Sequence, residues 1–84
     1  MTREEVFALV QAHLVDELDV DPARIDDSTR FKDLAADSLD LYTLVLELED
    51  SYGVKMSDEQ AARILTVGQA VDFVLANDRP REPR

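Results

Sequence analysis

The feature that most limits the fold of this chain is a set of capping boxes, each placed just before apolar residues at helical spacing. In a capping box, two polar side chains three residues apart each bond the other's backbone amide at the start of a helix. The sequence holds four such pairs, namely Thr2 and Glu5, Asp37 and Asp40, Ser57 and Gln60, and Thr66 and Gln69. They predict four helix starts within 84 residues.

The apolar periodicity that follows these starts predicts helices over residues 3–18, 38–52, 58–64 and 67–76, the third being short. No run alternates apolar and polar residues as a strand does. The connection over 19–36 is long, but apolar residues recur along it as anchors to the core, at Val20, Ile25, Phe31 and Leu34. We therefore expect an all-α four-helix bundle in one domain, residues 1–77, with a long ordered loop between the first two helices. Residues 78–84 contain two prolines and are predicted to be a disordered tail.

The predicted second helix has two apolar faces. In a small bundle one face can be buried against the other helices, and the second is left near solvent. The broader face suits the core and consists of Leu41, Leu44, Val45, Leu48 and Tyr52. The adjoining face has Leu39, Tyr42 and Leu46 at spacings of three and four, with an acidic rim of Asp37, Asp40, Glu47, Glu49 and Asp50. An exposed apolar stripe with a charged rim is typical of an interaction site. A helix at the centre of the bundle would instead bury both faces, and we favour the interaction site.

The residue inventory gives little support to catalysis by the chain itself. The chain has no Cys, only two Gly and one His, and no G-x-S-x-G motif surrounds any serine. The acidic residues between positions 19 and 27 lack the spacing and the glycine of a calcium-binding loop. We predict a protein that is not an enzyme, with no catalytic residues and no dedicated metal site, in which His13 is structural or faces solvent.

The charge of the chain indicates which partners it favours. It has nine basic and 19 acidic residues, of which residues 78–84 hold three and two, so residues 1–77 have a net charge of −11. This field repels nucleic acid and anionic lipid but attracts proteins with basic patches. No apolar stretch exceeds five residues and no signal-peptide pattern is present, so we expect a cytoplasmic protein that is not a membrane protein.

The serine at position 38 lies where the second helix is predicted to begin, between the carboxylates of Asp37 and Asp40. The amides and the dipole at a helix start favour an anionic group, so the Ser38 hydroxyl is well placed to be modified with a phosphodiester. The plainer interpretation is a serine that only helps to begin the helix.

The stretch Asp33-Leu34-Ala35-Ala36-Asp37-Ser38-Leu39-Asp40 resembles the D-L-G-A-D-S-L-D signature of acyl carrier proteins. The similarity continues through residues 41–59 and 64–68, and at a lower level it extends over essentially the whole chain apart from the last seven or so residues. The chain departs from the family pattern at four positions on or near the expected docking surface, Ala35, Thr43, Glu47 and Ser57. These departures leave the attachment site intact but weaken an assignment to general fatty acid synthesis.

The resemblance implies a four-helix carrier with a covalent 4′-phosphopantetheine arm on Ser38, attached from coenzyme A by a phosphopantetheinyl transferase. Its other expected partners are acyl-loading, ketosynthase-type and acyltransferase-type enzymes with basic patches, and the carrier itself is expected to be a monomer. The docking residues implied are Asp37, Leu39, Asp40, Tyr42, Leu46, Glu47, Glu49, Asp50, Asp58 and Glu59. Two alternatives stay open: an aminoacyl or peptidyl carrier of a secondary pathway, and an unmodified acidic helical adaptor for a basic protein.

Overall fold

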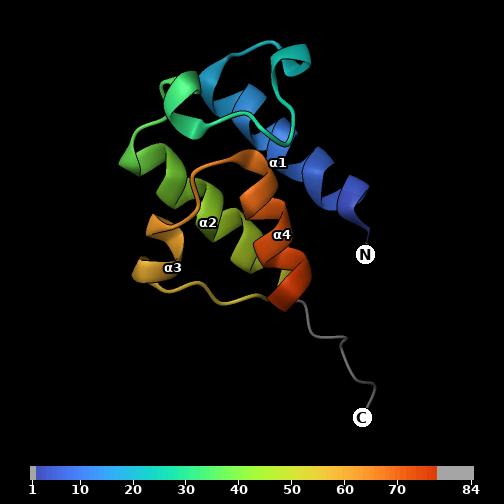
Figure 1. Ribbon diagram of the computed structural model, residues 1–84, viewed down its shortest axis with the longest axis vertical. Helices are drawn as coiled ribbons and strands as arrows, with labels where there is room; N and C mark the ends of the chain where they lie inside the picture. Colours follow the sequence, from blue (N-terminus) through green and yellow to red (C-terminus); the bar gives the residue numbers. More distant parts are fainter. Residues whose placement is uncertain (1, 78–84) are drawn as a thin grey trace.

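Four α-helices form the architecture of the computed structural model, which describes residues 2–77 (Figure 1). They are α1 (Arg3–Leu18), α2 (Ser38–Tyr52), α3 (Asp58–Ala62) and α4 (Val67–Asn77). The predicted all-α fold with a short third helix is confirmed. The predicted disordered tail over 78–84 lies outside the described residues, so the domain boundary at residue 77 stays a prediction. Among the described helices, none is long and apolar enough to cross a bilayer.

The four predicted capping boxes all form, which explains why the helix starts were readable from the sequence. At the start of α1, the Thr2 hydroxyl accepts from the Glu5 amide at 3.1 Å, and the Glu5 carboxylate accepts from the Thr2 amide at 2.8 Å. The same reciprocal bonds join Asp37 with Asp40, Ser57 with Gln60, and Thr66 with Gln69. Each box satisfies amides that have no partner within the helix.

Two predicted helix ends need correction. Helix α3 ends at Ala62 and not at Ile64, because the amides of Arg63 and Ile64 bond the carbonyls three residues earlier, at 3.1 Å each. Such bonds tighten the last turn and stop the helix. Helix α4 runs one residue further than predicted, to Asn77, whose side-chain amide donates to the Phe73 carbonyl at 2.8 Å.

The long connection between α1 and α2 is ordered and contains two short 3₁₀ helices, η1 (Pro22–Arg24) and η2 (Phe31–Leu34). Of the four predicted anchors, three are buried and Val20 is half-buried. Inside the loop, the Ser28 hydroxyl, the Thr29 hydroxyl and the Ser28 amide donate to the Asp26 carboxylate and lower its pKa.

Backbone hydrogen bonds join this loop to the start of α4. The Phe31 amide donates to the Leu65 carbonyl at 3.1 Å, and the Val67 amide donates to the Thr29 carbonyl at 2.9 Å. Next to them, the Gly68 amide donates to the Asp27 carbonyl at 2.9 Å. A Cβ atom at Gly68 would lie 2.7 Å from that oxygen, so glycine is required for this close approach. Arg3 adds ion pairs with Asp27, at 3.1 Å, and with Asp72 of α4.

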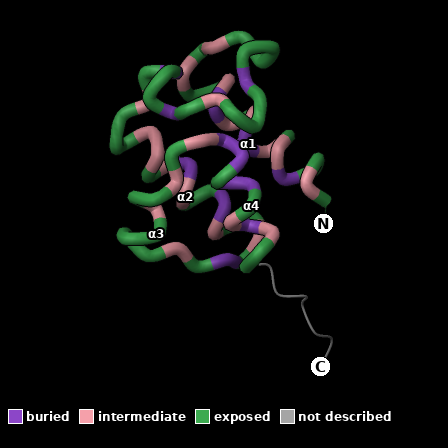
Figure 2. The backbone as a smooth tube through the Cα atoms, viewed as in Figure 1, coloured by how far each residue is buried: buried purple, intermediate pink, exposed green. Residues whose placement is uncertain are grey.

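The core lies between α1, α2 and α4, with the loop anchors at one end (Figure 2). Its fully buried members are mostly aliphatic and include Val6, Val10 and Leu14 of α1, Leu48 of α2, and Val67, Val71 and Val74 of α4. On the predicted core face of α2, Leu44 and Leu48 are buried, whereas Leu41, Val45 and Tyr52 are only half-buried. Helix α3 has no buried residue at all. Of these half-buried residues, Leu41 and Val45 face a part of the molecule that packing fills incompletely.

Candidate functional site

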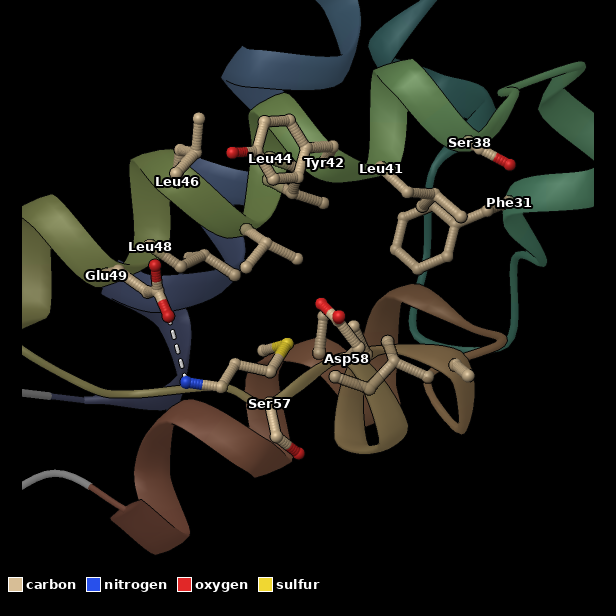
Figure 3. Close-up of a pocket in the computed structure, with 16 residues that line it drawn as sticks. Phe31, Ser38, Leu41, Tyr42, Leu44, Leu46, Leu48, Glu49, Ser57 and Asp58 are labelled. Atoms are coloured by element: carbon tan, nitrogen blue, oxygen red, sulfur yellow. Dashed lines mark hydrogen bonds between the residues drawn. The ribbon is translucent and has the colours of Figure 1, made fainter.

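Ser38 is the first residue of α2 and its side chain is exposed. Its position is set by Asp37, the N-cap residue, whose carboxylate accepts from the Asp40 amide at 3.0 Å, while the Asp40 carboxylate accepts from the Asp37 amide at 3.1 Å. Each of the two carboxylates flanking Ser38 thus accepts a backbone hydrogen bond. In Figure 3 the Ser38 hydroxyl points away from the neighbouring apolar side chains. The hydroxyl is therefore open to approach by another molecule.

The turn that leads into Ser38 contains an unusual backbone conformation at Ala35. This residue has φ 60° and ψ 26°, the left-handed region, and among the described residues only Asp19 shares this among non-glycine residues. The Ala35 amide bonds the Lys32 carbonyl and the Ala36 amide bonds the Phe31 carbonyl, both at 3.1 Å. This turn closes η2 and redirects the chain toward α2. The acyl carrier protein signature has glycine at this position, but the alanine found here does not by itself predict a left-handed conformation.

The second apolar stripe of α2 is exposed, as the docking interpretation requires. Leu39 is 68% exposed, Tyr42 is 59% exposed and Leu46 is 45% exposed. A fourth large apolar residue, Leu65, is 60% exposed on the segment before α4. Its carbonyl accepts from the Phe31 amide, which places this segment next to η2. Leu65 was not predicted, because a single apolar residue outside a periodic run gives no signal of its own.

The predicted acidic residues fall into two groups. Most are exposed on α2 and α3, namely Asp37, Glu47, Asp50, Asp58 and Glu59, whereas Asp40 and Glu49 are half-buried. Glu49 differs from the others because one of its carboxylate oxygens, Oε2, accepts a hydrogen bond from the Met56 amide at 2.9 Å. The carboxylate of Glu49 therefore contacts the protein's own backbone, and its predicted role in docking stays a prediction.

A cavity of 330 Å³ lies between α2 and α3 (Figure 3). Its wall is mainly apolar, and Ser38 and Glu49 belong to the lining at its two ends along α2. The lining from α2 includes the half-buried Leu41 and Val45, and the opposite side includes Met56, Ala61 and Ile64. No polar or charged residue is fully buried within residues 2–77, and the polar side chains that line the cavity are half-buried or exposed, namely Ser38, Tyr42, Glu49, Ser57 and Asp58. The cavity suits an apolar chain.

His13 lies apart from this cavity, between α1 and α2. Its Nε2 atom is 3.4 Å from the hydroxyl oxygen of Thr43, which in turn donates to the Asp40 carbonyl at 2.8 Å. His13 is not among the residues that line the cavity below Ser38. Within residues 2–77, no three side chains of His, Asp or Glu are grouped so that they could hold a metal ion.

Comparison with known proteins adds to this geometry. Residues 8–74 match the family described as the phosphopantetheine attachment site. The acyl carrier protein of Rubrobacter xylanophilus is 43% identical over 76 residues, which cover 89% of this chain and 94% of that protein.

Solved structures agree in fold. A structure of the acyl carrier protein from Enterococcus faecalis is 44% identical, with a TM-score of 0.80, and the match covers 92% of this chain and 99% of that one. The acyl carrier protein from Thermotoga maritima is 27% identical, with a TM-score of 0.77 and coverage of 89% and 88%. The chain therefore belongs to the acyl carrier protein family, whose members hold acyl groups on a covalent 4′-phosphopantetheine arm.

Proposed function

We propose that the hydroxyl of Ser38 is the attachment point of the 4′-phosphopantetheine arm, and that the chain carries acyl groups between enzymes of fatty acid or polyketide-type biosynthesis. The observation that carries this proposal is the exposed hydroxyl at the first residue of α2, at one end of an apolar cavity. When attached, the arm supplies a terminal thiol that holds acyl groups as thioesters. Partner enzymes, in the cytoplasm, supply the catalysis.

The residues around Ser38 fit a phosphodiester. The start of a helix as long as α2 favours a negative charge through its dipole and its unpaired amides. Asp37 and Asp40 would oppose that charge, but each carboxylate accepts a hydrogen bond from the other residue's amide, which offsets part of the repulsion. The exposed Ser38 side chain leaves room for a long substituent without displacing core residues.

The cavity next to Ser38 gives the apolar part of an acyl group a place to avoid water. Burying apolar surface is favourable by roughly 25 cal/mol per Å², and the lining from α2 and α3 is apolar over most of its extent. A guest with several polar groups would lose hydrogen bonds to water and find few partners inside. The cavity therefore favours aliphatic cargo over aminoacyl cargo.

Docking of partner enzymes is assigned to the exposed face of α2 and the adjacent start of α3. The apolar contacts come from Leu39, Tyr42 and Leu46, and the surrounding acidic groups come from Asp37, Glu47, Asp50, Asp58 and Glu59. Apolar residues supply the contact area, whereas exposed charges speed the encounter with a basic patch and set its orientation. Because this surface lies beside Ser38, an enzyme docked on it is close to the point at which the arm is attached.

The test of the attachment site is intact mass spectrometry after incubation with coenzyme A, Mg²⁺ and a broad-specificity phosphopantetheinyl transferase. The natural chain is expected to gain one 4′-phosphopantetheine group, and Ser38→Ala is expected to gain none. Ser57→Ala is the matched control, because Ser57 is also an exposed serine at a helix start and its loss should leave the modification intact. A modified Ser38→Ala protein, or an unmodified natural chain, would overturn the proposal.

A further inference from the structure

The hydrogen bond between Glu49 and Met56 joins α2 to the segment that precedes α3. The Oε2 atom of Glu49 accepts from the Met56 amide at 2.9 Å, the dashed line in Figure 3. Met56 and Glu49 both line the cavity, and both are half-buried. This bond therefore fixes a piece of backbone at the wall of the cavity.

Within the described residues, α3 itself supplies no buried side chain to hold this wall in place, although Ile64, just after α3, packs against the core. Helix α3 has five residues, none of them buried, and it begins two residues after Met56. Its own cap, the Ser57 and Gln60 box, is internal to α3 and does not tie it to α2. On the other side of Met56, Val54 is buried and anchors the segment where it leaves α2. Between Val54 and α3, the backbone is bonded to α2 through the Glu49 carboxylate.

We propose that Glu49 is a positioning residue for the cavity, because its carboxylate holds Met56 and the start of α3 in place and so limits how readily the cavity opens. The proposal rests on the proposed function in one respect, since it takes the cavity as the shelter for the apolar part of the cargo. It gives Glu49 a role different from that of its exposed acidic neighbours. The role depends on a hydrogen-bond acceptor and not on a negative charge.

That difference allows a sharp choice of variants. Glu49→Gln keeps an acceptor oxygen at the same distance along the side chain but removes the charge. Glu49→Ala removes both. Asp50→Ala is the matched control, because it deletes an exposed carboxylate from the next position of α2. A residue that only attracts partners would respond alike to Gln and Ala, whereas a positioning residue is rescued by Gln.

The first measurement is amide hydrogen exchange in the unmodified protein, which does not depend on the arm. The reporter is the Ala61 amide, which donates to the Ser57 carbonyl at 2.9 Å within α3. Loss of one hydrogen bond is expected to speed its exchange about tenfold in Glu49→Ala and to change it less than about threefold in Glu49→Gln and Asp50→Ala. The Val71 amide in the core of α4 serves as the internal reference and should keep its exchange rate in all variants.

The second measurement is the rate at which hydroxylamine cleaves the thioester of octanoyl-loaded and acetyl-loaded protein. An eight-carbon chain is long enough to enter the cavity, whereas an acetyl group has almost no apolar chain to shelter. Glu49→Ala is expected to speed cleavage of the octanoyl thioester several-fold and to leave the acetyl thioester unchanged. Glu49→Gln should behave as the natural chain does with both.

The outcomes separate this proposal from the attachment proposal. Unchanged Ala61 exchange in Glu49→Ala overturns the role of Glu49, even if Ser38 is modified normally. Equal effects of Gln and Ala also overturn it, since charge would then be the property that matters. If Ala61 exchange responds as expected but the chain accepts no arm, the positioning role stands and the attachment to Ser38 fails.

Discussion

Replacing Ala35 with glycine is expected to stabilise the protein, although glycine usually destabilises. Ala35 has φ 60° and ψ 26°, a conformation that costs a residue with a Cβ atom about 1–2 kcal/mol. Glycine adopts it without that cost but loses roughly 0.5–1 kcal/mol more conformational entropy on folding. The methyl group of Ala35 is exposed, so its removal forfeits little burial. The net gain is about 0.75 kcal/mol, the difference between the midpoints of these two ranges.

Thermal unfolding followed by far-ultraviolet circular dichroism measures this gain. For a domain of this size, a gain of that magnitude raises Tm by about 3–6 °C. Ala23→Gly is the matched control, because Ala23 is also exposed, lies in the same connection between α1 and α2, and is not among the positive-φ residues of the described chain. The control variant loses more conformational entropy on folding, as glycine does, and relieves no backbone strain, so its Tm should fall. A Tm for Ala35→Gly that is equal to or below that of the natural chain would refute the reasoning.

Two further predictions concern Gly68 and Glu47. Gly68→Ala should lower the stability by about 1–3 kcal/mol, because the new Cβ atom would lie 2.7 Å from the Asp27 carbonyl oxygen and the backbone would have to move. Helix propensity alone predicts that the same change raises the stability by about 1 kcal/mol. A higher midpoint in urea unfolding would therefore show that the backbone at Asp27 moves aside at little cost in free energy. Glu47→Lys should weaken binding to a phosphopantetheinyl transferase about three- to tenfold, and the effect should shrink as salt is added. Glu17→Lys makes the same charge change at an exposed position of α1 and should bind normally; equal losses in both variants would point to net charge and not to the α2 surface.

The helix starts were predictable because each is fixed by local chemistry. A capping box needs only two side chains three residues apart, and all four predicted boxes form. Helix ends were less predictable, because whether the last turn tightens depends on backbone bonds such as those at Arg63 and Ile64. The exposed stripe of α2 was predictable from its spacing, since a small bundle buries the broader face first.

Sequence periodicity could not predict the contacts that the site makes between separate elements of the chain. Glu49 was grouped with the acidic rim because of its position on α2, and only the path of the chain after Gly53 brings the Met56 amide to its carboxylate. Gly68 lies in the first turn of α4, where the sequence alone gives no reason for a residue of weak helix propensity. Its purpose lies in the loop residue Asp27, which is 41 positions earlier in the chain and whose carbonyl it meets. The cavity likewise depends on how α3 lies against α2 and not on either helix alone.

Because α3 has no buried residue, whereas α1, α2 and α4 share the core cluster, we expect the α3 wall of the cavity to yield before the other three helices do. A guest of larger size can push this wall outward without disturbing the aliphatic contacts among α1, α2 and α4. A carrier with this arrangement can hold acyl chains of different lengths, because each added carbon displaces the short helix α3 and leaves the rest of the fold in place.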